Sequence, residues 1–131
     1  MSSFTQIPTL YTFEPKSALA QSAEHVADAL TTVLSDGPLV LLISGGSVTH
    51  LAGRVAQRLV QSHARLDHLT LTLFDERFVP HGSPDSNEMA LHAQNVITPL
   101  TENGATWRPF LDDTPDTSGS VLAKRASTWL K

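Results

Sequence analysis

The stretch from Leu39 to His50 places the strongest constraint on the fold. It begins with an apolar run, Leu39–Ile43, which is too short to cross a membrane and does not alternate with polar residues. Such a run is typical of a strand buried on both faces. The run stops at Ser44-Gly45-Gly46-Ser47, and apolar residues then recur as on a helix that packs against a sheet: Leu51, Val55 and Leu59, with Ala52 and Ala56 beside them. The sequence therefore predicts a strand, a glycine turn and a helix.

This glycine turn is a candidate anion site. Gly45 and Gly46 allow a tight turn and let a ligand approach main-chain N–H groups. The turn leads into a helix N-terminus, where unpaired N–H groups and the helix dipole favour a phosphate or a carboxylate. The hydroxyls of Ser44, Ser47 and Thr49 add donors. The alternative is a structural turn in which a serine caps the helix and no ligand binds.

Three common motifs are excluded at this turn. It lacks the Gly-x-x-x-x-Gly-Lys-Ser/Thr pattern of a nucleotide P-loop and the Gly-x-Gly-x-x-Gly pattern of a dinucleotide site. Neither serine is framed as the Gly-x-Ser-x-Gly nucleophile of a hydrolase. If the turn binds a ligand, these exclusions favour a general anion over a nucleotide, and the structural turn without a ligand stays open as the alternative.

The rest of the chain alternates strand and helix patterns. Residues 68–74 place leucines on one face, Asp36-Gly37-Pro38 ends the helix before the central strand, and Asp85 or Ser86 can cap a later helix. This alternation predicts parallel strands joined by right-handed crossovers in a layered α/β sheet. The expected elements besides the central unit are strands at residues 9–13, 68–74 and 106–110, helices at residues 19–34, 86–97 and 121–130, and an acidic loop at residues 112–120.

A charged triplet, Asp75-Glu76-Arg77, follows the strand predicted at residues 68–74. Ligands of open α/β sheets bind beyond the carboxyl ends of the strands, so this triplet is expected at the same edge as the glycine turn. Two loops that converge on one edge favour a binding site. The alternative is a solvated turn with a surface ion pair of little energetic value.

Composition limits the class of protein. The chain has 131 residues, 40% hydrophobic and 17% charged, with a net charge of -4, which fits one globular domain and provides no basic stripe for nucleic acid. It has no cysteine, which excludes disulfides and thiolate metal sites and fits a cytoplasmic protein. We find no signal peptide and no run near the roughly 20 apolar residues that a membrane span needs.

The six histidines do not have the spacing of metal ligands. Four are expected on helices or at a strand start: His25, His63, His68 and His92. Only His50 and His81 are expected near the binding edge, where either could contact a ligand. We therefore predict no metal site.

The final helical pattern, residues 121–130, leaves Trp129 on an apolar face with no later segment to cover it. A parallel sheet of three or four strands with uncovered faces is incomplete. We therefore expect residues 1–131 to form the N-terminal portion of a single larger α/β domain, or to complete themselves by self-association.

Three motifs in this order resemble the 6-phosphogluconolactonase family, part of a larger group that contains glucosamine-6-phosphate deaminase. They are Ser44-Gly45-Gly46-Ser47, Asp75-Glu76-Arg77-x-Val79-Pro80 and Ser86-Asn87. The resemblance implies a Rossmann-like α/β fold and hydrolysis of 6-phosphoglucono-δ-lactone in the pentose phosphate pathway, without metal or organic cofactor. Arginine at the third position of the triplet favours lactonase, because the deaminase usually has Asp-Glu-Tyr.

The resemblance also implies roles for individual residues. The turn of Ser44, Gly45, Gly46 and Ser47 would hold the sugar phosphate, and Arg77 would supply positive charge to the phosphate or to the developing oxyanion. Asp75 would orient the lactone or water or assist the base. Ser86 and Asn87 would brace the Asp-Glu-Arg loop rather than contact substrate.

Two departures from the family pattern matter. Val48-Thr49 replaces the usual Thr-Pro after the turn, and Thr49 is expected to take part of the missing threonine's role. The family's Gly-x-Gly-x-Asp-Gly-His segment, whose histidine is the proposed general base, is absent from the 131 residues. We therefore expect a lactonase parent and an inactive chain. The alternatives are a sugar-phosphate isomerase or deaminase, or a non-catalytic anion-binding module.

Overall fold

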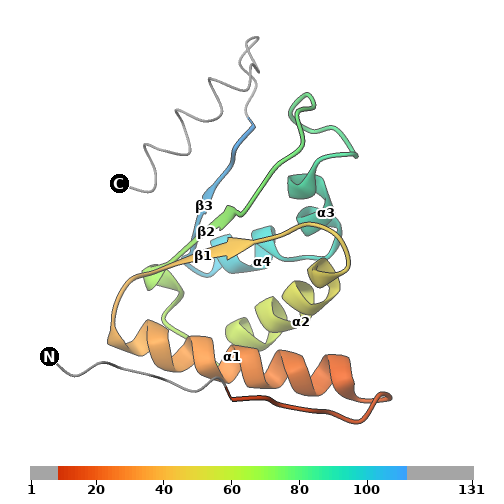
Figure 1. Ribbon diagram of the computed structural model, residues 1–131. Helices are drawn as coiled ribbons and strands as arrows, with labels where there is room; N and C mark the ends of the chain where they lie inside the picture. The colour runs from red at the N-terminus through yellow and green to blue at the C-terminus, as the bar shows by residue number, and fades with distance from the viewer. Residues whose placement is uncertain (1–8, 112–131) are drawn as a thin grey trace, which may run out of the picture.

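Three parallel strands form the sheet around which the chain is arranged (Figure 1). The computed structural model describes residues 9–111. Within them the strand order follows the chain order, β1-β2-β3, and both pairings are parallel. The strands are β1 (Leu39–Ile43), β2 (Leu69–Leu73) and β3 (Thr106–Arg108). Each lies where the sequence predicts a strand, and the α/β fold class is confirmed.

One face of the sheet carries the hydrophobic core. Leu69, Leu71 and Leu73 of β2 are buried there, as their alternation predicts. Val40 and Leu42 of β1 alternate to the other face and are 51% and 46% exposed. The prediction that this first strand is buried on both faces is therefore wrong for the described residues, because their core cluster lies against a single face.

Two long helices pack together and contribute to that core. Helix α1 (Ala18–Asp36) packs along α2 (Val48–Gln61) below the sheet in Figure 1. The residues that α1 buries include Ala23 and Ala27, small side chains that allow the two helices to approach closely. Arg58 of α2 donates to Glu24 of α1 at 2.9 Å, an exposed pair of small energetic value. Both helices end as predicted, and Gly37 follows α1.

The helix predicted at residues 86–97 is two helices, α3 (Asn87–Ala93) and α4 (Ile97–Glu102). Asn95 adopts a φ of 56° between them, a left-handed conformation that interrupts a helix and that asparagine tolerates better than most residues. Ser86 caps α3 as one of the two predicted candidates, because its hydroxyl accepts from the N–H of Met89 at 3.1 Å.

Other differences lie outside the sheet core. Residues 9–13 do not form the predicted strand, since Leu10 is 87% exposed and Tyr11 packs against the His25 ring at a centroid distance of 4.0 Å. The loop expected at residues 112–120 and the helix expected at residues 121–130 lie outside the described residues. A bilayer could not be crossed by any helix within residues 9–111.

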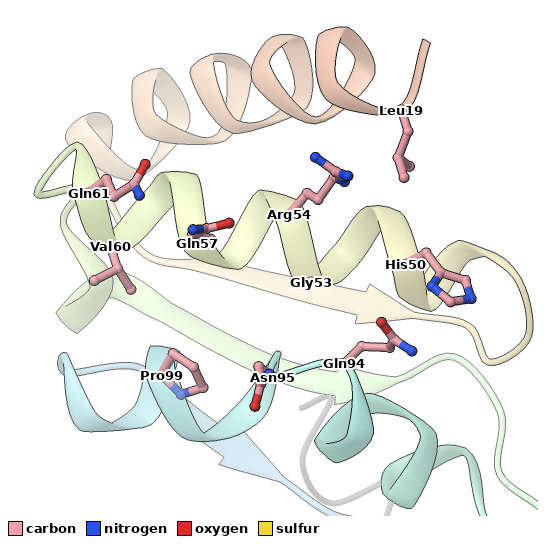
Figure 2. A pocket seen from close by; sticks show the side chains of 10 residues that line it. All are labelled: Leu19, His50, Gly53, Arg54, Gln57, Val60, Gln61, Gln94, Asn95 and Pro99. Carbon is pink, nitrogen blue, oxygen red and sulfur yellow. The ribbon is translucent and has the colours of Figure 1, made fainter. Parts of the chain in front are cut away.

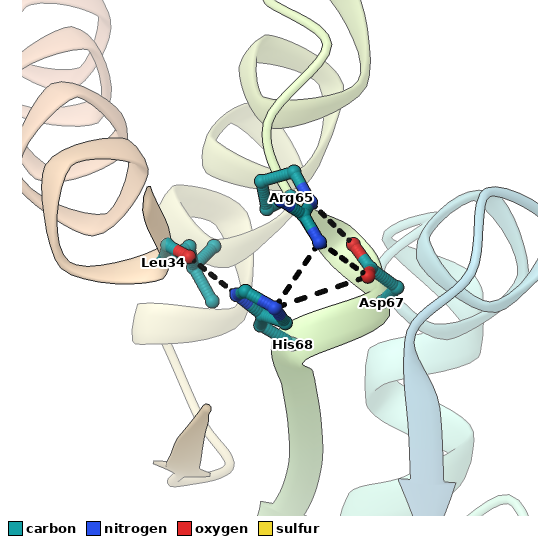
Figure 3. Close-up of polar contacts among 4 residues, drawn as sticks. All are labelled: Leu34, Arg65, Asp67 and His68. Atoms are coloured by element: carbon teal, nitrogen blue, oxygen red, sulfur yellow. Dashed lines mark hydrogen bonds and ion pairs between the residues drawn. The ribbon is translucent and has the colours of Figure 1, made fainter. Parts of the chain in front are cut away.

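A small polar cluster fixes the amino end of β2 (Figure 3). It lies in and beside the short 3-10 helix η1 (Leu66–His68), which the sequence analysis missed. Arg65 makes two hydrogen bonds to the Asp67 carboxylate, at 3.0 and 2.9 Å, and lowers the pKa of Asp67 to about 2. His68 Nδ1 lies 2.6 Å from the carbonyl oxygen of Leu34, which links the end of α1 to the start of β2.

Candidate functional site

The two loops that the sequence singled out begin side by side. The glycine turn (residues 44–47) follows β1, and the Asp-Glu-Arg loop (residues 75–77) follows β2. Ile43 and Leu73 are paired in the sheet, and the N–H of Phe74 donates to the carbonyl of Ile43 at 2.9 Å. The predicted convergence of both loops on the carboxyl edge of the sheet is therefore confirmed.

The glycine turn leads directly into α2. Gly46 has a φ of +79°, which favours glycine, and its carbonyl accepts from the hydroxyl of Thr49 at 2.8 Å. Thr49 is buried, so its predicted role as a ligand donor is corrected to one of stabilising the turn. Ser47 precedes the helix but makes no capping hydrogen bond, and the hydroxyls of Ser44 and Ser47 remain exposed. These two can still meet a ligand.

Glu76 turns inward and ties the Asp-Glu-Arg loop to the start of α3. One carboxylate oxygen, Oε1, accepts from the N–H groups of Arg77 and Asn87, both at 2.7 Å. The other, Oε2, accepts from the N–H of Glu88 at 3.0 Å. The carboxylate therefore satisfies N–H groups that a helix leaves unpaired at its first turn. Sequence reasoning gave Glu76 no role; the signal was an acid at a strand end shortly before a helix start.

Asp75 and Arg77 point away from this network. Both residues are exposed, and within residues 9–111 their side chains make no ion pair with each other or with any other group. The surface ion pair that was the alternative reading of this loop is therefore not observed there. The Asp75 carboxylate and the Arg77 guanidinium are exposed on a loop that begins beside the glycine turn.

Ser86 and Asn87 brace the loop, as the resemblance implied. Ser86 caps α3, and the amide Nδ2 of Asn87 donates to the carbonyl of Asp75 at 3.1 Å. Both are buried. Their role in the described structure is to hold the backbone of the Asp-Glu-Arg loop.

Glu88 forms a buried polar centre that the sequence analysis did not foresee. It is 5% exposed and accepts from Trp107 Nε1 at 2.9 Å, which joins α3 to β3. His81 Nε2 lies 3.6 Å from its Oε2, and His92 Nε2 lies 4.0 Å from its Oε1. Of the two histidines expected near the edge, His81 therefore contacts an acid that belongs to α3. Residues 9–111 contain no group of acids and histidines arranged to hold a metal ion.

His50 belongs to a separate cleft of about 670 Å³ (Figure 2). Its walls are the outer side of α2, which carries Arg54, and the junction between α3 and α4, which carries Gln94. Neither the glycine turn nor the Asp-Glu-Arg loop lines it. His63 and His68 also differ from expectation, since His63 follows α2 with a φ of 54° and His68 lies in η1.

A model of the family described as glucosamine-6-phosphate isomerases/6-phosphogluconolactonase matches residues 14–123. The chain belongs to this family. The members named in that description act on sugar phosphates, which agrees with an anion site at the carboxyl edge of the sheet. No curated protein matches the chain.

A solved structure adds a second comparison. The present chain is similar to the crystal structure of a 6-phosphogluconolactonase from Shewanella baltica OS155, with a TM-score of 0.69 and 25% sequence identity. The match covers 91% of this chain and 49% of that chain. The chain therefore spans about half the length of the lactonase it resembles.

Proposed function

We propose that this chain supplies half of the active site of a 6-phosphogluconolactonase, which hydrolyses 6-phosphoglucono-δ-lactone to 6-phosphogluconate. The observation that carries the proposal is that the glycine turn and the Asp-Glu-Arg loop begin side by side, with the side chains of Asp75 and Arg77 exposed and without an ion pair within residues 9–111. An isomerase or deaminase of the same family is the second candidate. The triplet favours the lactonase, because Arg77 stands where the deaminase usually has tyrosine.

In this proposal the glycine turn holds the phosphate. Main-chain N–H groups at the start of α2 and the hydroxyls of Ser44 and Ser47 would donate to its oxygens, and Gly45 and Gly46 would allow close approach. Arg77 adds a charge-assisted donor, which is stronger than a neutral one. The exposure of these groups agrees with such a role.

Hydrolysis needs a water molecule that attacks the lactone carbonyl while a base removes its proton. The attack places negative charge on the carbonyl oxygen, which a positioned cation such as Arg77 can stabilise. Asp75 would orient the lactone or the water. The base would come from the Gly-x-Gly-x-Asp-Gly-His segment of the family, which residues 1–131 lack. The isolated chain should therefore bind product weakly and turn over no lactone.

The test compares the protein from the full reading frame with the isolated 131-residue chain. Each is assayed for hydrolysis of 6-phosphoglucono-δ-lactone and for deamination of glucosamine 6-phosphate. We expect lactone hydrolysis by the longer protein only. Deamination without lactone hydrolysis would support the second candidate, and activity in neither assay would contradict an enzyme.

Arg77→Ala tests the site itself in the longer protein. We expect kcat/KM for the lactone to fall by about tenfold or more, because a charge-assisted contact to phosphate or oxyanion is lost. Arg54→Ala is the matched control, since it removes an exposed arginine that lies on the cleft of α2 instead. If Arg77→Ala and Arg54→Ala change kcat/KM equally, the substrate does not bind at Arg77.

A further inference from the structure

Gly45 and Gly46 are glycine for different reasons. Gly46 has a positive φ, whereas Gly45 does not. A Cβ added to Gly45 would lie 2.1 Å from Oδ1 and 2.5 Å from Cγ of Asn87, distances at which atoms overlap. Position 45 is therefore glycine because the Asn87 side chain fills the space beside it.

Asn87 also has a fixed orientation. Its backbone N–H donates to Glu76, and its side-chain Nδ2 donates to the carbonyl of Asp75, which turns the amide oxygen toward Gly45. The residue is 9% exposed. A single buried amide thus contacts the glycine turn after β1 and holds the Asp-Glu-Arg loop after β2.

The helix that carries Asn87 is anchored to the third strand. Glu88, the next residue, accepts from Trp107 of β3, and its backbone N–H donates to Glu76. The first turn of α3 therefore has contacts with segments from all three strands. A shift of Asn87 relative to the sheet would break several of them together.

We propose that Asn87 is a positioning residue that sets the distance between the glycine turn and the Asp75–Arg77 pair. Because the amide fits against Gly45 and bonds the Asp75 carbonyl, the two loops cannot move independently. The phosphate-binding half of the site is then formed within this chain before substrate binds. The proposal rests on the proposed function for the identity of the ligand, and on the contacts of Asn87 for the coupling.

A double-mutant cycle tests the coupling without any ligand. The variants are Gly45→Ala, Asn87→Ala and their combination, compared by backbone amide NMR spectra of the 131-residue chain. We expect Gly45→Ala to shift the amide signals of residues 75–77 when Asn87 is present and to leave them nearly unchanged when residue 87 is alanine. Equal shifts in both backgrounds would overturn the proposal.

Asn103→Ala is the matched control. Asn103 Nδ2 donates to the carbonyl of Pro99 at 2.8 Å, so it makes the same type of bond at the far end of α4. We expect Asn87→Ala to change the signals of both loops and Asn103→Ala to change neither. If Asn87→Ala does not fold, Asn87→Asp keeps the size and the backbone donor and replaces the Nδ2 donor with a charged carboxylate oxygen that cannot bond the Asp75 carbonyl. Changes confined to residues near 87 would contradict a positioning role.

Affinity separates positioning from a merely structural role. At a temperature where circular dichroism shows each variant folded, Asn87→Ala should weaken binding of 6-phosphogluconate by about tenfold, the order expected for one lost hydrogen bond network. Asn103→Ala should not weaken it. If the NMR cycle shows coupling but Asn87→Ala leaves the affinity for 6-phosphogluconate unchanged, the positioning role is overturned. If the unsubstituted 131-residue chain binds no 6-phosphogluconate, the proposed identity of the ligand is wrong. The NMR double-mutant cycle still tests whether Asn87 couples the two loops.

Discussion

The two ends of the central strand use polar groups in opposite ways. At the amino end of β2, Arg65 and Asp67 pair with each other in solvent, and His68 bonds the Leu34 carbonyl (Figure 3). At the carboxyl end, Glu76 bonds three backbone N–H groups. Its charged neighbours make no ion pair within residues 9–111.

This difference distinguishes polar groups that stabilise the fold from polar groups that we propose to bind a ligand. At the amino end, the charges of Arg65 and Asp67 pair with each other. The carboxyl end satisfies backbone groups with the partly buried carboxylate of Glu76, and it leaves Asp75 and Arg77 exposed on the loop that begins beside the glycine turn. We propose that the charges without an ion pair within residues 9–111 are the ones that bind a ligand, and the two ends of β2 allow this proposal to be tested on one strand.

Glu76→Ala should have the largest effect on stability. It removes the acceptor of two N–H groups at the start of α3 and of the N–H of Arg77, and we expect a loss of about 3 kcal/mol in the free energy of unfolding. Urea unfolding measures this loss. Glu102→Ala, which removes an exposed acid at the end of α4, should cost far less. Equal losses would mean that Glu76 does not support the carboxyl end.

Trp107→Phe should have the next largest effect. It keeps an aromatic ring but removes the indole N–H that bonds the buried Glu88, and we expect a loss of about 2 kcal/mol. The comparison with Glu88→Gln, which retains an acceptor for the indole, uses the same unfolding assay. A larger loss from Glu88→Gln than from Trp107→Phe would show that the contacts with His81 and His92 dominate.

Asp67 should make the amino end sensitive to acid. Its pKa in the folded chain is about 2, against an ordinary value of 3.8, because Arg65 donates to the carboxylate. The pair therefore stabilises the fold above about pH 3.8, and this contribution is lost as the pH falls toward about 2. The expected effect is small, because the pair is exposed.

The measurement is the thermal midpoint of wild type and Asp67→Asn between about pH 5 and about pH 2. The difference between the two proteins should shrink as the pH falls. Asp28→Asn, which removes an exposed acid of α1, is the control. A difference that stays constant over this range would show that the pair does not stabilise the fold.

Arg77→Ala should have the smallest effect on stability, within about 0.5 kcal/mol, because the side chain is exposed and makes no ion pair within the described residues. The same substitution is expected to reduce lactone hydrolysis strongly. Unfolding and activity measured on one preparation would show both. A large loss of stability would show that Arg77 stabilises the fold. The two ends of β2 would then no longer differ in how they use their charged side chains.

The sequence predicted the strands well because their patterns are local. The leucines of β2 alternate, and the run of β1 is bounded by proline and glycine. The prediction from sequence failed for features that depend on tertiary packing. The left-handed conformation of Asn95 and the exposure of Val40 and Leu42 have no signal in the local apolar pattern.

The site was predicted in the same uneven way. The convergence of the two loops follows from parallel topology, so the positions of Gly46 and Arg77 could be foreseen. The bracing of the loop by Asn87 was implied by the family resemblance, and the structure agrees. The roles of Glu76 and Glu88 could not be foreseen, because a carboxylate reads as solvated until its partners are known. Thr49 shows the opposite error. Its hydroxyl was predicted to donate to a ligand, but it donates to the carbonyl of Gly46 within the turn.

The strand order β1-β2-β3 has a consequence for how the chain acquires its structure. Within residues 9–111, β2 pairs with β1 across α2 and η1, and β3 pairs with β2 across α3 and α4. Leu39 pairs with Leu69 and Thr70 with Thr106, so each pairing waits for a whole crossover segment and forms more slowly than a local contact. The sheet can therefore grow by one strand at a time at a single edge as the ribosome delivers the chain, and the two loops of the site come together once β2 docks on β1.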